Sequence, residues 1–156
     1  MAFSPVTSTL IEQLTAVVGA QYVFSDAENR SAYGHDETED LNHPPEVVVK
    51  PGNTEEVAAV VALCHAANVP VTPVGGRTGL SGGALSIHGG VAVAMERFNR
   101  ILEIDEQNLQ ATVEPGVITQ VFQEAVIERG LFYPPDPSSR GSCFCLLYTS
   151  PSPRDA

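Results

Sequence analysis

Basic residues are scarce in this sequence. Eight Lys and Arg stand against 19 Asp and Glu, so the formal net charge is -11 over 156 residues. A polyanion would therefore meet a repulsive field over most of the surface. We expect no nucleic-acid partner, and an anionic membrane surface is an equally poor partner.

Long apolar runs are also absent. No stretch reaches about 18 apolar residues, the length that a membrane span needs, and the first 30 residues lack a basic start followed by an apolar run. We therefore expect no membrane span and a cytoplasmic location. Three cysteines, an odd number, suit reduced thiols better than a disulfide framework.

What is present is the composition of an ordinary globular domain, with 43% apolar and 17% charged residues. The capping-box spacing of Thr9 and Glu12 predicts a short helix that ends at Gly19. The polar stretch 25–46 follows, and it is interpreted as a surface connection. The core is expected to begin at Val47.

From Val47 onward the pattern predicts strand, helix, three further segments of strand that include a hairpin, and a last helix. A strand at 46–50 precedes a helix with Asn53 as its N-cap, and strands follow at 69–74 and 89–95. Residues 101–116 alternate like a hairpin, and a helix over 119–129 ends at Gly130. The residues expected to face inward from the two helices are Val57, Val60, Val61, Cys64, Val121, Phe122, Ala125 and Val126. This order predicts an α+β domain with a small mixed sheet, because the βα alternation stops after Gly83.

The stretch "VGGRTGLSGG", Val74 to Gly83, is the strongest chemical signal. Its glycines let the main chain approach a ligand closely, so consecutive N–H groups can converge on phosphate oxygens. Thr78 and Ser81 offer hydroxyl donors, and Arg77 offers charge. The stretch matches neither a P-loop nor the G-x-G-x-x-G order. On glycine content alone, a flexible inter-strand turn without a ligand is an equal alternative.

Three ordered motifs carry a family resemblance. The segment from His43 to Ser86, "VEPGV" at 113–117 and "YPPDPSSRGSCF" at 133–144 together resemble the FAD-binding domain of the vanillyl-alcohol oxidase, or p-cresol methylhydroxylase (PCMH), type. Within that group the sequence is most similar to FAD-linked D-lactate dehydrogenase and the FAD subunit of glycolate oxidase. The resemblance covers about two thirds of the chain.

The resemblance implies a flavoprotein oxidoreductase and a set of cofactor-binding residues. The loop would wrap the FAD diphosphate with its backbone, while two later motifs would line the same site. The residues implied to bind FAD are Pro73, Gly75, Gly76, Arg77, Thr78, Gly79, Leu80, Ser81, Gly82, Glu114, Pro115, Gly116, Pro135, Asp136, Ser138, Ser139 and Ser142.

Some relatives attach FAD covalently through a His in this loop. The matching stretch here has none, so we expect non-covalent FAD, with His88 a surface turn residue.

The resemblance further implies oxidation of a small 2-hydroxy acid, D-lactate or glycolate, by hydride transfer to the flavin and reoxidation by an electron acceptor. The full-length enzyme could also lie peripherally at a membrane. The alternatives are a flavoenzyme of the same fold with another substrate and a non-catalytic nucleotide- or phosphate-binding module.

Other candidate sites are weaker. The stretch 35–43 gathers two His and four carboxylates, but clustering in sequence does not make a ligand geometry, and no metal is expected. Cys64 is expected to be a buried, unreactive thiol. Glu114 could act as a general base, but shaping the cofactor pocket is the favoured role. No catalytic residue is assigned.

The sequence divides into three parts. Residues 1–43 are interpreted as a helical lead-in with an acidic connection. Residues 44–144 are a partial PCMH-type FAD-binding domain, with its first subdomain complete and its second truncated. Residues 145–156, "CLLYTSPSPRDA", resemble a translated sequencing adapter, so the Cys143/Cys145 pair is an accident of the join. We expect the fragment alone to be inactive and to bind FAD weakly or not at all.

Overall fold

The computed structural model describes residues 3–144, so the interpretation of residues 145–156 lies outside the described residues. The chain forms two compact units, Met1–Arg97 and Phe98–Ala156. Each unit has its own core and is described by itself.

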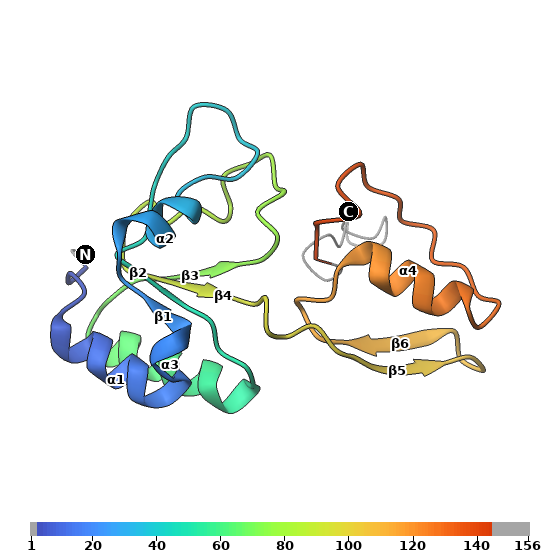
Figure 1. Cartoon of the computed structure of the whole chain (residues 1–156), viewed down its shortest axis with the longest axis horizontal. Coiled ribbons are helices and arrows are strands. Elements are labelled where there is room, and N and C mark those ends of the chain that lie inside the picture. The colour runs from blue at the N-terminus through green and yellow to red at the C-terminus, as the bar shows by residue number, and fades with distance from the viewer. Residues whose placement is uncertain (1–2, 145–156) are drawn as a thin grey trace, which may run out of the picture. The chain divides into compact units, whose positions relative to one another are not determined.

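The first unit contains a four-stranded sheet in the order β1-β2-β4-β3 (Figure 1). The strands are β1 (Val23–Phe24), β2 (Val47–Val49), β3 (Val71–Val74) and β4 (Val91–Ala94). The strands β2, β4 and β3 are parallel, and β1 joins the edge antiparallel to β2. The sheet is therefore mixed, as expected.

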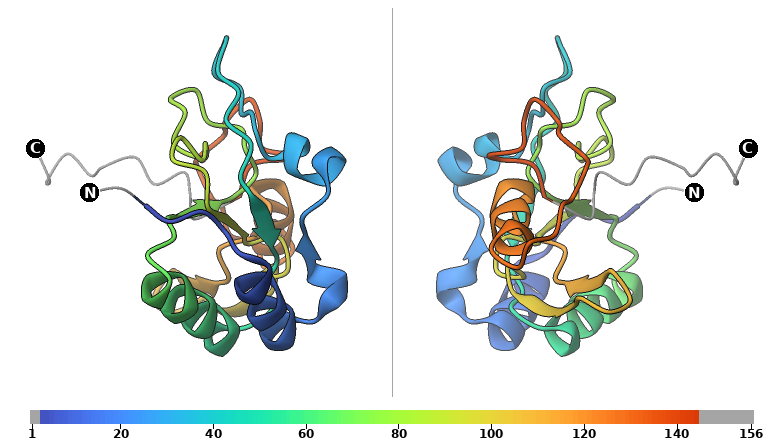
Figure 2. Two further views of the ribbon diagram at one scale, coloured as in Figure 1. Left: turned by 90° about the vertical axis from the view of Figure 1, so that its left-hand side faces the viewer. Right: turned by 90° about the vertical axis from the view of Figure 1, so that its right-hand side faces the viewer.

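Helices cover the sheet unequally. The helices α1 (Ser8–Val18) and α3 (Thr54–Ala66) pack against each other on one face, as both views in Figure 2 show. The 3₁₀ turn η1 (Ala20–Tyr22) leads from α1 into β1, and the short α2 (Ala27–Ala32) follows β1. Figure 2 also shows the loops after β3 and after α2 rising on the side away from α1 and α3.

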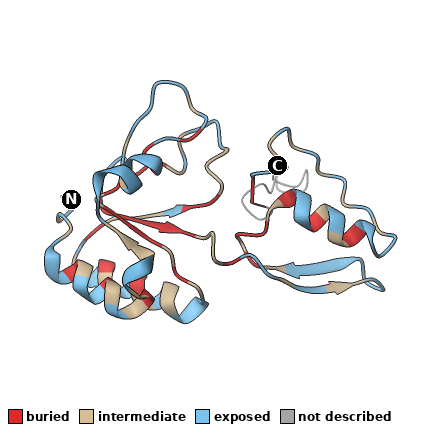
Figure 3. Ribbon diagram, in the orientation of Figure 1, coloured by how far each residue is buried: buried red, intermediate tan, exposed pale blue. Residues whose placement is uncertain are grey.

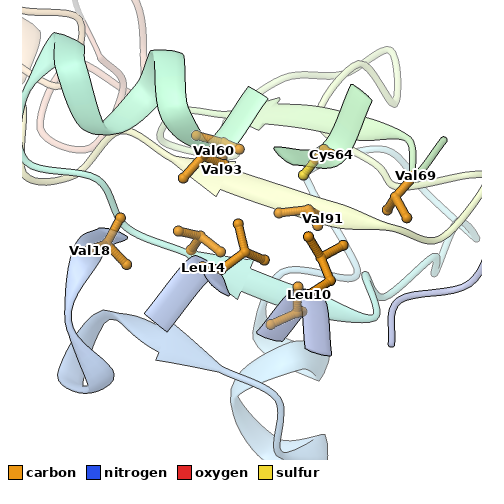
Figure 4. Close-up of a cluster of buried hydrophobic side chains, with 10 residues drawn as sticks. Leu10, Leu14, Val18, Val60, Cys64, Val69, Val91 and Val93 are labelled. Carbon is orange, nitrogen blue, oxygen red and sulfur yellow. The ribbon is translucent and has the colours of Figure 1, made fainter. Parts of the chain in front are cut away.

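Alternation along β2 and β4 builds a core on each face of the sheet. One core combines Val47, Val49, Val91 and Val93 with the inward residues of α1 and α3 (Figure 4). The other combines Val48 with Ala92, Ala94, Val74 and Tyr33. Because β2 and β4 are buried on both faces, they are continuous apolar runs in the sequence (Figure 3).

Two helix starts test the capping predictions. Asn53 caps α3 as predicted, because its Oδ1 accepts the Glu56 N–H at 2.8 Å. The predicted cap of α1 was wrong: Thr7, not Thr9, accepts the Leu10 N–H at 3.2 Å. Gly19 ends α1 as predicted.

The second unit is built from a hairpin and a helix. The strands β5 (Ile101–Asp105) and β6 (Gln110–Val113) pair antiparallel as a separate two-stranded sheet, and α4 (Thr119–Ile127) follows. Their core contains Val117, Phe122 and Val126. The hairpin and the helix were predicted at these places, and the α+β class is confirmed.

Three expectations about burial were wrong. Val61 and Val121 are 45% and 49% exposed, because the buried faces of α3 and α4 pass through Val60 and Phe122 instead. The core does not begin at Val47, since α1 contributes three buried residues. The stretch 25–46 is more than a surface connection, because it contains α2 and the buried Tyr33. Within residues 3–144, no helix has the length and hydropathy to cross a membrane.

Candidate functional site

The glycine-rich loop leaves the sheet at the carboxyl end of a parallel strand. β3 ends at the buried Val74, and the chain from Gly75 to Gly83 then runs as bends and turns before it returns to β4. In α/β sheets this end of the strands is where ligands usually bind. Leu80, in the middle of the loop, is 76% exposed, so its side chain does not pack into a core.

The loop presents a run of backbone donors. Within residues 3–144, none of the backbone N–H groups from Gly75 to Ser81 donates a hydrogen bond, and the hydroxyls of Thr78 and Ser81 have no partner. The Nε of Arg77 is buried and also lacks a partner in this part of the chain. Consecutive backbone donors without a protein partner can bind phosphate oxygens. The loop therefore fits the diphosphate of a nucleotide cofactor.

The segment after α2 holds the outside of this loop. The N–H of Glu37 donates to the Gly79 carbonyl at 3.1 Å, and the N–H of Gly82 donates to Thr38 Oγ1 at 2.8 Å. Asp36 supports this arrangement, since its Oδ1 accepts the Thr38 N–H at 2.9 Å. These bonds engage the Gly79 carbonyl and the Gly82 N–H, so the N–H groups from Gly75 to Ser81 stay available.

The second unit fixes the predicted residues Glu114, Pro115 and Gly116. The carboxylate of Glu114 is buried and accepts three hydrogen bonds from Arg100: Nη2 at 2.6 Å, Nε at 3.0 Å and the backbone N–H at 2.8 Å. Gly116 donates its N–H to the Phe98 carbonyl at 2.6 Å. The residues before β5 thus hold those after β6.

The hydrogen bonds from Arg100 determine the protonation state of Glu114. Its hydrogen bonds lower the pKa of Glu114 below the usual range of a carboxyl group. The carboxylate is ionised at neutral pH and both oxygens are occupied, so Glu114 is not a free general base. Its geometry agrees with the favoured structural role. The register of the hairpin could have predicted the pairing of Arg100 with Glu114. Ile101 lies opposite Val113, so the next residues outward on the two strands are Arg100 and Glu114.

The segment 135–142 is anchored to α4. Gln123 Nε2 donates to the Pro135 carbonyl at 2.7 Å, and the N–H of Gln120 donates to the Arg140 carbonyl at 2.9 Å. Arg140 also pairs with Asp136 at 3.0 Å. Asp136, Ser138 and Ser142 are exposed, while Pro135 and Ser139 are half-buried. These side chains are accessible to a ligand.

The predicted cofactor residues therefore form two groups. Pro73 and the loop residues from Gly75 to Gly82 are contiguous in the first unit, and the remaining eight are in the second. Their roles toward FAD stay predictions. Tyr33 and Thr38, which contact the loop's surroundings, were missed because they are more than 40 positions away in the sequence.

The other candidates give no site. Among residues 3–144, no group of three or more His, Cys, Asp and Glu side chains could hold a metal ion. Burial raises the pKa of the Cys64 thiol, as expected for an unreactive cysteine. Cys143 is buried 3.1 Å from Thr119 Oγ1, and Cys145 lies outside the described residues.

A family model described as an FAD binding domain matches residues 45–145. Among curated relatives, glycolate oxidase subunit GlcD of Bacillus subtilis is 42% identical over 86% of this chain and 28% of its own length. D-lactate dehydrogenase of Anaerostipes hadrus is 39% identical over 88% of this chain and 29% of its own. D-2-hydroxyglutarate dehydrogenase of Stutzerimonas stutzeri is 39% identical over 85% and 29%. The chain thus spans less than a third of these relatives' length.

Solved structures show the same fold. Alkyldihydroxyacetonephosphate synthase superposes with a TM-score of 0.79 at 20% identity, covering 92% of this chain and 32% of the other. p-Cresol methylhydroxylase superposes with a TM-score of 0.74 at 23% identity, covering 83% and 27%. At these identities the likeness concerns the fold, and the PCMH-type fold that the motifs predicted is confirmed.

Proposed function

Because this chain belongs to the FAD-binding domain family, we propose that the loop from Gly75 to Ser81 binds the diphosphate of FAD through its backbone N–H groups. The observation that carries the proposal is the run of consecutive N–H groups without a partner in the described part of the chain. The two groups of predicted residues, around Glu114 and between Pro135 and Ser142, complete the site in this proposal.

The FAD is held without a covalent bond in this proposal. No His occurs between Val74 and Gly83 to provide an attachment point. His88 lies beyond the loop, and its ring is 5.4 Å from that of Phe3. Bound FAD supplies an acceptor for two electrons, and the protein supplies position and electrostatics.

The substrate of the whole protein is proposed to be a small 2-hydroxy acid. The relatives' names, glycolate oxidase, D-lactate dehydrogenase and D-2-hydroxyglutarate dehydrogenase, share a hydroxyl group on the carbon next to a carboxylate. D-lactate or glycolate is our proposed substrate, and a separate electron acceptor takes the electrons onward.

We also propose that residues 44–144 form the FAD-binding part and that residues 145–156 are a translated adapter.

Amide resonances of the loop test the cofactor proposal. The isolated chain is expected to bind FAD weakly or not at all, so the titration extends to high FAD concentration, where any binding should shift the amide signals of Gly75 to Ser81 in ¹⁵N NMR spectra. The isoalloxazine ring should add shifts in the second unit that ADP does not produce. ADP binding as tight as FAD binding, with no such added shifts, would favour the non-catalytic nucleotide-binding module. A folded chain in which FAD shifts signals elsewhere and leaves those of the loop unmoved contradicts the proposal.

The isolated chain is expected to have no dehydrogenase activity. It spans less than a third of the relatives' length, and no residue in the described part has been assigned to proton abstraction. With FAD added, neither D-lactate nor glycolate should bleach the flavin absorbance under anaerobic conditions. Substrate-dependent bleaching by the purified 156-residue chain would show that this expectation is wrong.

A further inference from the structure

Arg77 has a backbone conformation that most side chains avoid. Its φ is 57°, in the left-handed region, within a loop where glycine would adopt this angle without strain. A non-glycine residue persists there only if the surrounding structure stabilises it. The contacts of the Arg77 side chain must therefore supply this stabilisation.

Those contacts come from the C-terminal end of α2. The guanidinium carbon of Arg77 lies 4.6 Å from the centre of the Tyr33 ring, and its Nη1 donates a hydrogen bond to the Ala32 carbonyl. A cation over an aromatic face is attracted more strongly when the pair is shielded from water, and Tyr33 is 6% exposed. The stack and the hydrogen bond together offset the strain at Arg77.

Tyr33 is itself held rigidly. Its ring belongs to the second core of the sheet, and its hydroxyl donates to Glu96 Oε1 at 2.5 Å. Burial raises the pKa of Tyr33 above its ordinary value, and the bond to Glu96 adds to the shift, so the phenol keeps its proton. Lys50 donates to the other Glu96 oxygen, also at 2.5 Å. The ring therefore has a fixed place for Arg77 to stack on.

We propose that Tyr33 is a positioning residue for the phosphate loop: its ring holds Arg77, and Arg77 fixes the loop so that the N–H groups from Gly75 to Ser81 converge on the cofactor's diphosphate. The inference rests on the proposed FAD function. The bonds of Glu37 and Thr38 to Gly79 and Gly82 fix the far side of the same loop. The segment after α2 thus becomes the scaffold of the loop.

Trypsin reports directly on whether Arg77 is held, since it must draw the arginine side chain into its own pocket. In Tyr33→Leu, cleavage after Arg77, relative to cleavage after Arg97, should accelerate about fivefold, as expected from loss of one shielded stack. Tyr33→Phe keeps the ring and should restore the wild-type ratio. Normalising to Arg97 removes any acceleration that comes from general destabilisation of the unit.

The matched control is Tyr22→Leu. Tyr22 stacks under Arg97 at 3.6 Å in the same unit, so its loss should speed cleavage after Arg97 and not after Arg77. An unchanged Arg77 to Arg97 ratio in Tyr33→Leu overturns the inference. Equal acceleration in Tyr33→Phe also overturns it, because the ring would then not be what holds Arg77.

FAD titration separates this inference from the proposed function. The wild-type arm tests the function, since FAD-induced shifts that lie outside the loop contradict it. If the loop signals move, Tyr33→Leu should weaken FAD binding about fivefold and Tyr33→Phe should not, whereas undiminished binding in Tyr33→Leu overturns the positioning role. If Tyr33→Leu does not fold, Tyr33→Met keeps most of the apolar volume and removes the ring. The same weakening is then expected, and unchanged FAD binding overturns the role.

Discussion

Replacing Gly90 with alanine is expected to lower the free energy of unfolding by about 2–5 kcal/mol, the sum of left-handed strain and overpacking. Gly90 has a φ of 75°, and a Cβ atom there would lie 2.2 Å from the Pro70 carbonyl oxygen, which is backbone and cannot move aside easily. Urea denaturation followed by circular dichroism measures the change.

The reason for so large an effect is the place of Gly90 in the sheet. Its carbonyl accepts the N–H groups of Glu46 and Val47, and the next residue, Val91, donates to Pro70. Glu46 Oε2 accepts the Gly90 N–H as well, at 2.9 Å. Gly90 thus leads β4 into its position between β2 and β3. A displacement there would disturb both neighbouring strands.

Gly83→Ala is the matched control for this prediction. A Cβ atom at Gly83 would have no neighbour within 4 Å, and its φ lies outside the left-handed region. We expect its free energy of unfolding to stay within about 0.5 kcal/mol of wild type. Equal stability of the two variants would show that the close approach of Gly90 to Pro70 does not constrain the fold.

The local elements of this fold could be predicted because their signals are local. Asn53 and Glu56 cap a helix from within four residues, and the hairpin at 101–113 follows from alternation around a turn. The order of the strands could not be predicted in the same way. β4 inserts between β2 and β3, and only packing between distant segments decides that.

Elements without an apolar pattern were missed. α2 has six residues and none is buried, so its sequence has no helical periodicity to detect. The N-cap Asp26, which accepts the Asn29 N–H at 2.9 Å, was the available signal. β1 has two residues and pairs only with the edge of β2. α2 was included in the expected surface connection, whereas β1 lies just before it, where no element was predicted.

The candidate site also has a part that could be predicted from the sequence and a part that could not. The loop and its glycines could be recognised in the sequence, because a run of backbone donors is formed by consecutive residues. Tyr33 and Thr38 are not visible as parts of it, since their contacts to Arg77 and Gly82 join residues 44 positions apart. The sequence therefore predicted the candidate binding loop, but not the residues that hold this loop in place.

Replacing Gly79 with leucine is expected to weaken FAD binding by about 5- to 140-fold, because overpacking a close contact costs about 1–3 kcal/mol and 1.4 kcal/mol corresponds to a factor of ten. The only heavy atom near an added Cβ is Asp36 Oδ2 at 3.8 Å, and φ is outside the left-handed region. A Cβ atom at Gly79 therefore meets no close contact among the described residues. ¹⁵N NMR titration with FAD measures the loss.

Gly83→Leu shows whether this loss reflects the ligand or the loop. Both glycines have room for a Cβ atom and neither has a positive φ, but only Gly79 lies between the free N–H groups of Thr78 and Ser81. If the backbone approaches the diphosphate closely, Gly79→Leu alone should lose FAD while both variants unfold at the same urea concentration. Equal FAD affinity in the two variants would mean that the cofactor does not approach the backbone at Gly79. The run of unpaired N–H groups would then need another explanation.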